Sequence, residues 1–248
     1  MNQNPTLPWS TPLAAPLDPP FPIAFRDVEV LTLAYRTAPD AVRNQLPAPL
    51  EPISDQVLIH VYNMRDVDYL GPYGECNVML GAELPGKVRG GYSPFLFINS
   101  DAGLSQGRTV HGQPKKWGNP RVEVRGDLIV GILERNGIDV LTGTMGYKHR
   151  RGDLADLKHN AYDFSINLNY KLIQHIDGRP AVRQITSRAL ADVRVHECWR
   201  GPCTVEIRPH ILAPLHQLPV LETVEAYYWR AGFSLVPGTI VYDYLETL

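Results

Sequence analysis

Apolar residues alternate with polar ones over long stretches of this chain. Between positions 164 and 172 every second residue is apolar: Phe164, Ile166, Leu168, Tyr170 and Leu172. A period of two is typical of a β-strand with one buried face, because successive side chains point to opposite sides of a strand. The run ends at the turn signal Asp177-Gly178, and a second run follows over 181–189. The two runs predict a β-hairpin.

Two further turn signals lie between apolar segments. Asn136-Gly137 divides the stretch 128–145, and this dipeptide is favoured in two-residue hairpin turns. The tripeptide Arg200-Gly201-Pro202 separates a run with Val193 and Val195 from a run with Val205 and Ile207. Many strands at regular spacing favour an antiparallel barrel or sandwich.

Signals for helices are few. Thr37 is positioned to cap a short helix that begins near Pro39. Pro47 ends this helix, and Val42 lies on its buried side. A second short helix is predicted over 153–159. The chain is therefore expected to be mainly β.

The sequence predicts one domain preceded by an arm. Residues 1–22 are rich in proline and lack periodicity, so we expect an extended arm that lies on the surface or on a neighbouring subunit. No repeat or linker divides residues 23–248, and the 248-residue chain is 44% hydrophobic, enough for one sizeable core. An arm of this kind also suggests a homo-oligomer.

The charge balance excludes some partners. There are 24 Lys and Arg against 26 Asp and Glu, a net charge of −2, without a basic run, so neither nucleic acid nor an anionic membrane is an expected partner. The N-terminus has no basic and apolar targeting segment, and no apolar run approaches the roughly 18 residues of a membrane span, which predicts a cytoplasmic protein.

Common catalytic and metal-binding motifs are missing. The three cysteines have spacings that fit neither a redox pair nor a metal site, and free thiols are expected. We find no phosphate-binding loop, nucleophile elbow or dinucleotide fingerprint. No metal and no cofactor are therefore predicted.

Two adjacent lysines lie in a rigid and apolar stretch. Lys115 and Lys116 follow Pro114 and precede Trp117. A random lysine pair is usually a solvated turn, whereas an amine nucleophile that forms a Schiff base has to be neutral. A free lysine, with a pKa near 10.4, is almost wholly protonated at neutral pH, so either burial or a second cation has to penalise its charge. In a strand the two side chains would point to opposite faces, which favours burial, with Lys116 a secondary influence.

The motifs around these lysines resemble those of the acetoacetate decarboxylase superfamily. Seven segments carry the resemblance in the same order: 34–52, 71–75, 107–120, 144–149, 199–202, 210–220 and 241–245. The resemblance implies a closed, cone-like β-barrel with a reactive lysine inside it, and the matching lysine is Lys115. A neighbouring cation is the explanation usually given for the reactive lysine of acetoacetate decarboxylase itself.

The resemblance also points to partners for the lysine. Glu75 occupies the family's acidic position after Gly-Pro-Tyr, where a carboxylate could move protons to and from the reaction intermediates. Tyr242 and Tyr244 lie two residues apart and so share a strand face, and Tyr244 is a candidate proton relay. Gln113, two residues before Lys115, is a candidate substrate-binding residue.

The polar lining departs from the family pattern at three positions. Decarboxylases of the family carry an arginine on the first strand where this chain has Val28, and Arg26 is at best a displaced substitute. The family's second acidic position is His60 here, a candidate pocket residue, and the glutamate expected after Gly-Arg is Thr109. A retained lysine with an altered lining suggests Schiff-base chemistry on a different substrate.

Three functions are consistent with these observations. In the leading interpretation, Lys115 forms an iminium with a 2-keto acid such as pyruvate, and the enamine condenses with an aldehyde and loses water. The alternative is decarboxylation of acetoacetate or another β-keto acid through the same lysine. The third is a barrel that only binds a carbonyl ligand.

Overall fold

The computed structural model describes residues 18–153, 155–156, 163 and 165–246. The predicted proline-rich arm and the predicted helix over 153–159 fall mostly outside these residues. Within them the chain is mainly β, and its helices are short. Along the same part of the chain, no helix is both long and apolar enough to span a membrane.

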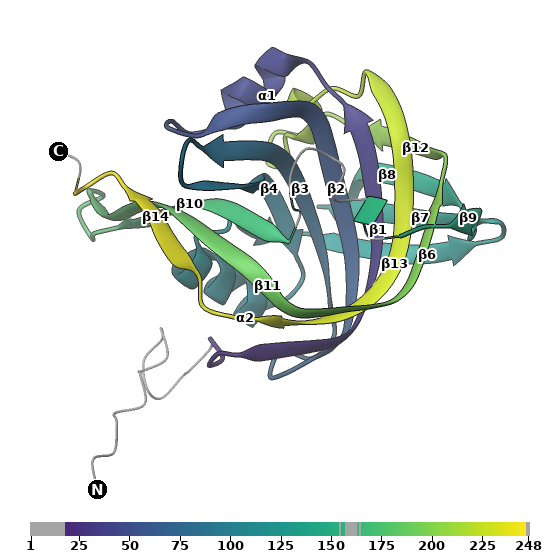
Figure 1. Ribbon diagram of the computed structural model, residues 1–248, viewed down its shortest axis with the longest axis horizontal. Coiled ribbons are helices and arrows are strands. Elements are labelled where there is room, and N and C mark those ends of the chain that lie inside the picture. The colour runs from purple at the N-terminus through teal and green to yellow at the C-terminus, as the bar shows by residue number, and fades with distance from the viewer. Residues whose placement is uncertain (1–17, 154, 157–162, 164, 247–248) are drawn as a thin grey trace, which may run out of the picture.

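Ten strands of the described chain form one sheet. They are β1 (Ile23–Arg36), β2 (Glu51–Val67), β3 (Tyr73–Leu84), β4 (Val88–Ile98), β5 (Lys115–Trp117), β9 (Arg150–Arg151), β10 (Ile166–Gln174), β11 (Pro180–Gly201), β13 (Glu222–Leu235) and β14 (Thr239–Asp243). The order is β10-β11-β13-β1-β2-β3-β4, and β4 pairs again with β10, so these strands close into a ring (Figure 1). β5 continues along β4 beyond that pairing.

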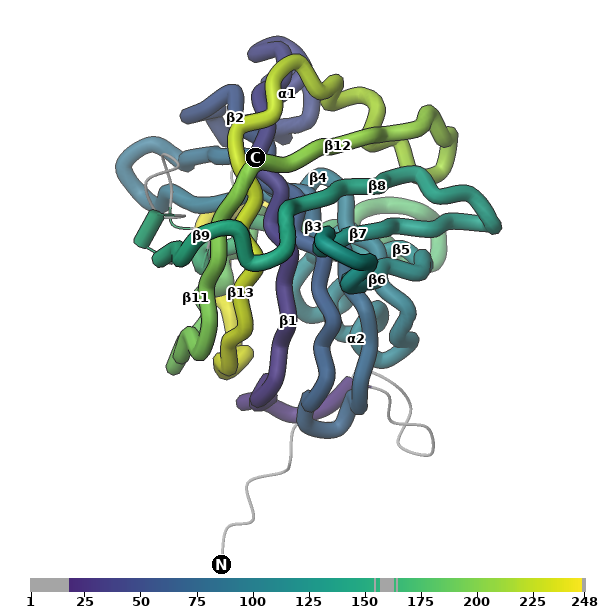
Figure 2. The backbone as a smooth tube through the Cα atoms, turned by 90° about the vertical axis from the view of Figure 1, so that its right-hand side faces the viewer, coloured from purple at the N-terminus to yellow at the C-terminus, as the bar shows by residue number. Residues whose placement is uncertain are grey.

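A second sheet covers one outer side of this ring. In the described residues it contains β6 (Asn119–Arg125), β7 (Leu128–Arg135), β8 (Ile138–Gly146) and β12 (Cys203–Ile207), in the order β12-β8-β7-β6. Figure 2 shows these strands running crosswise over β1. Leu33 and Ile59 of the ring pack with Ile129 and Leu141 of the second sheet, so the main apolar core lies between the two layers.

The inner face of the ring forms another apolar cluster. Strands β1 and β2 alternate between the two faces, so Val28 and Leu58 point inward while Leu31 and Ile59 point toward the second sheet. Trp229 of β13 is almost fully buried inside the ring. Both faces of these strands are therefore apolar, which stabilises the ring and leaves polar side chains inside it at a few positions only.

Two predicted hairpins are confirmed. β7 and β8 pair across Asn136-Gly137, where both residues have positive φ, 54° and 79°. β10 and β11 pair across the turn at Asp177-Gly178. The predicted fold class, a closed and largely antiparallel β fold with few short helices, is also confirmed, while β4 makes parallel pairings with β10 and β5.

The strands around Arg200-Gly201-Pro202 do not pair with one another. β11 ends at Gly201 in the ring, and β12 begins at Cys203 and pairs with β8 of the second sheet. Pro202 has no amide hydrogen with which to continue a ladder, so the chain changes sheets there. The predicted turn is instead a break of one residue, Pro202, between two strands of different sheets.

The described helices are α1 (Pro39–Gln45), α2 (Asp101–Gln106), the π-helical turn η1 (Gly107–His111) and the 3-10 turn η2 (Leu215–Gln217). α1 is where the sequence predicts it, with Pro39 in its first turn and Val42 fully buried. The predicted cap is wrong, because the N-cap residue is Ala38 and no side chain caps the helix. In Figures 1 and 2, α1 and α2 lie toward opposite ends of the molecule.

Candidate active site

A short helical segment delivers Lys115 to the inside of the ring. The Ser100 hydroxyl accepts a hydrogen bond from the Gly103 amide at the start of α2, and the chain continues into η1. Gly112, with φ of 79°, ends η1 in the left-handed region that favours glycine. The chain then extends, and Lys115 begins β5 opposite Leu96 of β4.

Gly107 leaves the space in which the lysine side chain lies. A Cβ atom at this position would lie 2.4 Å from Cδ and 2.6 Å from Cε of Lys115. These distances are far below van der Waals contact, so any larger residue would displace the amine. The glycine of the Gly-Arg motif is therefore part of the lysine site.

Lys115 and Glu75 form a buried ion pair. The Nζ atom of Lys115 donates to Oε2 of Glu75 at 2.9 Å, and the two side chains are only 7% and 9% exposed. Glu75 lies on β3, whose alternation also turns Tyr73, Asn77 and Met79 to the same side. Transfer of the proton from Lys115 to Glu75 would replace two buried charges by two neutral groups, which are easier to hold away from water.

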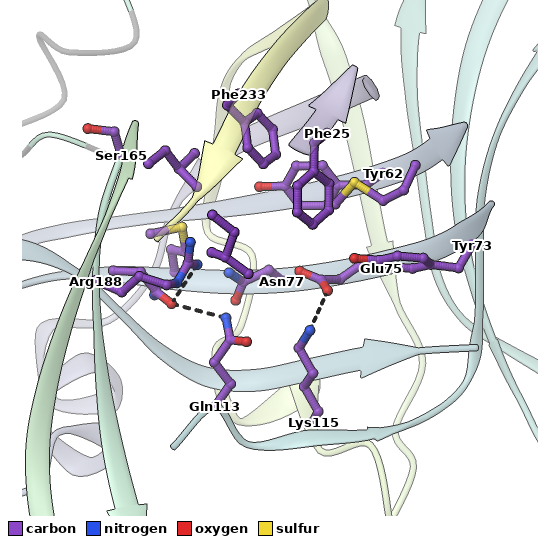
Figure 3. Close-up of a pocket in the computed structure, with 15 residues that line it drawn as sticks. Phe25, Tyr62, Tyr73, Glu75, Asn77, Gln113, Lys115, Ser165, Arg188 and Phe233 are labelled. Carbon is purple, nitrogen blue, oxygen red and sulfur yellow. Dashed lines mark hydrogen bonds and ion pairs between the residues drawn. The ribbon is translucent and has the colours of Figure 1, made fainter. Parts of the chain in front are cut away.

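The pair lies in a small cavity inside the ring (Figure 3). Its described lining is Phe25, Tyr62, Met64, Tyr73, Glu75, Asn77, Met79, Gln113, Lys115, Ser165, Asn167, Arg188, Leu190, Phe233 and Leu235. The volume open to the centres of water molecules is about 60 Å³. This space can hold several water molecules or a small keto acid.

Lys116 lies on the other face of β5, as predicted. Its side chain is exposed, and its Nζ atom donates to the carbonyl oxygen of Leu212 at 3.4 Å. The adjacent lysines therefore do not enter one pocket, and Lys115 alone of the two is buried. The two side chains point to opposite faces of the strand, which is the arrangement under which burial, and not Lys116, would penalise the charge of Lys115.

Gln113 lies in the cavity wall and is held by a polar chain. Its Nε2 atom donates to Oδ1 of Asn167 at 3.2 Å. The Asn167 amide in turn donates to Oγ of Ser93 at 2.8 Å and to the Gly91 carbonyl at 3.1 Å. These bonds fix the orientation of both amide side chains at the edge of the cavity.

His60 faces the interior of the ring, but the described residues that line the cavity do not include it. It is fully buried, and its Nδ1 atom lies 2.8 Å from the Thr32 hydroxyl. Burial lowers the pKa of His60 to about 3, so the ring is neutral at pH 7.

Arg26 does not replace the missing arginine of the first strand. Its guanidinium is exposed and forms ion pairs with Asp66 at 3.1 Å and Asp68 at 2.5 Å. Val28 is fully buried among apolar side chains of the inner cluster. Thr109 also lies away from the cavity lining, where its hydroxyl contacts Asp18.

The C-terminal tyrosines are not in the cavity lining of the described chain. Tyr242 and Tyr244 pack with Tyr170 in a separate apolar cluster. The Tyr244 hydroxyl donates to the Ala48 carbonyl, and burial raises its pKa to about 12. Tyr62 and Tyr73 supply the phenols of the cavity instead. Tyr73 was within reach of sequence reasoning, since it lies two residues before Glu75 on the same strand.

Arg188 is the main functional candidate that the sequence did not reveal. It belongs to β11 and pairs across the ladder with Asn167 of β10. The alternation of β11 turns Arg188 and Leu190 into the cavity, so a charged residue in the inward register was the available signal. The cavity thus contains two cationic side chains and one carboxylate, a set suited to an anionic carbonyl compound.

No metal site accompanies this cavity in the described residues. Within them, no group of three His, Cys, Asp or Glu side chains is arranged to hold a metal ion. The cavity offers a buried amine, a carboxylate within hydrogen-bond distance, two phenols and a guanidinium. These groups can form and protonate a Schiff base.

Comparisons with known proteins agree with this arrangement. The family model described as acetoacetate decarboxylase matches residues 6–245. An acetoacetate decarboxylase of Paraburkholderia xenovorans is 37% identical over 237 residues, which are 96% of this chain and 93% of the relative. A solved acetoacetate decarboxylase structure superimposes with a TM-score of 0.89 at 34% identity, covering 95% of this chain and 96% of the other.

A more distant structure shares the fold alone. The enduracididine biosynthesis enzyme MppR, solved with the condensation product of pyruvate and imidazole 4-carboxaldehyde, superimposes with a TM-score of 0.77 at 18% identity. The alignment covers 94% of each chain. At this identity the likeness extends to the ring architecture and not to the reaction.

Proposed function

The chain belongs to the acetoacetate decarboxylase family, and we propose that it decarboxylates acetoacetate or a closely similar β-keto acid through a Schiff base on Lys115. As a member of this family the protein is an enzyme, a carbon–carbon lyase. The observation that carries the proposal is the buried Lys115–Glu75 pair at 2.9 Å in a cavity of small volume.

The reaction requires the neutral amine of Lys115 to attack the ketone carbonyl. Loss of water from the carbinolamine gives an iminium. The bond between the α-carbon and the carboxylate then breaks, and its electron pair moves into the iminium to give an enamine and CO2. A proton adds to the enamine carbon, and water releases the ketone and the free lysine.

Glu75 is the proposed proton carrier for these steps. Its carboxylate can take the proton from the Lys115 ammonium and return it to the carbinolamine oxygen, which then leaves as water. Once ionised again, it lies beside the cationic iminium and stabilises it. Tyr62 and Tyr73 are the phenols near enough to the cavity to pass protons onward.

Decarboxylation is favoured over the condensation that the altered lining suggested. Relatives named acetoacetate decarboxylase are 35–37% identical over nearly the whole chain, whereas the condensation product is found in a structure that shares the fold alone. The cavity has room for a keto acid the size of acetoacetate.

A direct assay separates these reactions. Purified protein is incubated with acetoacetate, and the release of CO2 is measured. In a parallel assay the protein is incubated with pyruvate and an aldehyde, and near-ultraviolet absorbance reports any conjugated product. We expect CO2 release that borohydride abolishes in the presence of substrate, because reduction fixes the adduct on Lys115. A conjugated product from pyruvate without CO2 from acetoacetate would refute the decarboxylase proposal in favour of condensation.

Assembly and location stay predictions that rest on the sequence. We propose a homo-oligomer, since the proline-rich segment 1–22 suits an extended contact with a neighbouring copy. Light scattering at micromolar concentration should give a mass well above the 27.8 kDa of one chain. A monomeric mass would remove this proposal. We also propose a cytoplasmic location, which fractionation of cells that produce the protein would test.

A further inference from the structure

The cavity contains a second cation, Arg188, to which the proposed Schiff-base steps assign no role. Arg188 enters the cavity from β11, on the strand face that it shares with Leu190. Figure 3 shows its guanidinium and the Lys115–Glu75 pair within the same pocket, with Asn77 drawn between them. The arginine therefore faces the space in which a substrate joined to Lys115 would lie.

Arg188 makes no ion pair within the part of the chain that the structure describes. Its Nη2 atom donates to Oδ1 of Asn167 at a long 3.5 Å, and its Nε atom is buried without a hydrogen-bond partner. The carboxylate on the same side of the ring, that of Glu75, is bound to Lys115. A partly buried guanidinium that lacks a carboxylate is costly, and an anionic ligand would offset that cost.

The surroundings of Arg188 agree with this interpretation. Burial lowers the pKa of its guanidinium below the usual value, and the negative charge of Glu75 opposes that change. Asn167 is fixed by Gly91 and Ser93, and its Oδ1 atom lies 3.5 Å from Nη2 of Arg188, at the limit of a hydrogen bond. A planar guanidinium can bind both oxygens of a carboxylate at once.

The first strand supplies no alternative cation to the cavity. Val28 is buried in the apolar cluster, and Arg26 is exposed and paired with Asp66 and Asp68. Arg188 and Lys115 are the cationic residues among the described lining. One forms the Schiff base in the proposed function, which leaves the other for the carboxylate.

We infer that Arg188 binds the carboxylate of the keto acid while its carbonyl carbon is bonded to Lys115, so that this chain holds its substrate from β11 and not from β1. The inference rests on the proposed Schiff-base function. Asn167 acts as a positioning residue for the guanidinium. The substrate class is then a short keto acid whose two functional groups span the distance between the amine and the guanidinium.

The test compares carbonyl ligands with and without a carboxylate. Pyruvate and levulinate keep their carboxylate in a borohydride-trapped adduct, and acetone has none. The keto acid that the unaltered protein traps at the lower concentration is then used to compare the variants. Arg188→Gln should raise the half-saturating concentration of that keto acid about 10- to 100-fold, because a charge-assisted contact is lost. Acetone should be trapped within about twofold of the original concentration, since its adduct needs only Lys115.

Two variants serve as controls. Arg188→Lys keeps the charge without the fork of donors and should give an intermediate value, which also covers the case that the Arg188→Gln variant fails to fold. Arg26→Gln removes an exposed arginine whose partners are Asp66 and Asp68. It should leave the half-saturating concentrations of the keto acid and of acetone unchanged. An equal loss of keto acid and acetone, or no loss of the keto acid, would overturn the inference.

A ligand without a carbonyl separates this inference from the proposed function. 3-Hydroxybutyrate has the carboxylate but cannot form a Schiff base, and calorimetry should show binding that Arg188→Gln weakens about 10- to 100-fold. If the protein traps keto acids but releases no CO2 from acetoacetate, the decarboxylase proposal fails. The role of Arg188 is then still decided by how Arg188→Gln changes the half-saturating concentration of the keto acid relative to that of acetone. If nothing is trapped, 3-hydroxybutyrate decides it, and equal binding to both proteins would overturn the inference.

Discussion

The amine of Lys115 and the carboxylate of Glu75 lie 2.9 Å apart on β5 and β3, each almost completely buried. β4 lies between these two strands in the ring, so the pair depends on the register of three strands. The proposed mechanism requires a proton to pass between these two groups, so the pair is the proposed reactive centre.

Lys115→Arg should abolish adduct formation and leave the fold intact. Arginine keeps the positive charge beside Glu75 but cannot become a neutral nucleophile. The readout is borohydride trapping by mass spectrometry, with circular dichroism as a check of folding. Lys116→Arg is the matched control, since Lys116 is exposed on the other strand face, and it should retain trapping. Loss of trapping in the Lys116 variant would exchange the roles of the two lysines.

Glu75→Gln should slow turnover by about 10² to 10⁴ while the covalent adduct still forms. The amide occupies nearly the same volume but cannot take the proton from Lys115 or return it to the carbinolamine. Steady-state CO2 release and the rate of adduct formation should both be measured. Unchanged turnover would show that Glu75 has a structural role only.

Gly107→Ala should reduce turnover by about 10²-fold through displacement of the lysine. The added Cβ atom would lie 2.4 Å from Cδ of Lys115, and a misplacement of about 1 Å is enough for a loss of this size. Gly146→Ala is the control, because a Cβ atom there meets its nearest neighbour, His149, at 3.8 Å. Equal kcat in the native protein and the Gly107 variant would contradict the close approach.

Acid should destabilise the protein through its buried histidines. Burial lowers the pKa of His60 to about 3 and that of His111 to about 2, whereas unfolded histidine titrates near 6.5. The unfolded chain therefore binds more protons below about pH 6.5. Each histidine then removes up to about 1.4 kcal/mol of unfolding free energy per pH unit as the pH falls through this window.

Urea unfolding at several pH values between 7 and 4 measures this slope. His60→Asn should make it shallower, since asparagine can still contact the Thr32 hydroxyl but does not titrate. His175→Asn replaces an exposed histidine and should leave the slope unchanged. A His60 variant with the original slope would contradict the assignment of acid sensitivity to this residue.

Local signals predicted the local structure well. Asn136-Gly137 and Asp177-Gly178 favour tight turns by their own backbone preferences, and both hairpins form. The tripeptide Arg200-Gly201-Pro202 was predicted to form a turn, but the chain only breaks at Pro202 and continues as a strand of the other sheet. The choice of sheet depends on β8, whose residues lie more than fifty positions away along the chain.

The candidate site was predicted only in part, for the same physical reason. A distinctive motif surrounds Lys115, and strand alternation correctly separated it from Lys116. Alternation identifies a face but not a depth, so Tyr244, which follows the end of β14, was assigned to a cavity that it does not line. Arg188 was missed because the sequence does not show which residues lie opposite it across the ring, and only these make an inward-facing charge part of a site.

The walls of the cavity arrive on separate strands: β1, β2, β3, β5, β10, β11 and β13. Each strand is held by hydrogen bonds between backbone N–H and C=O groups, which do not involve the side chains that point inward. A mutation in one wall can therefore alter ligand preference without disturbing the ladder of any other. Libraries that randomise the inward-facing positions of two strands at a time should therefore change the ligands accepted around Lys115 while the backbone ladders are kept.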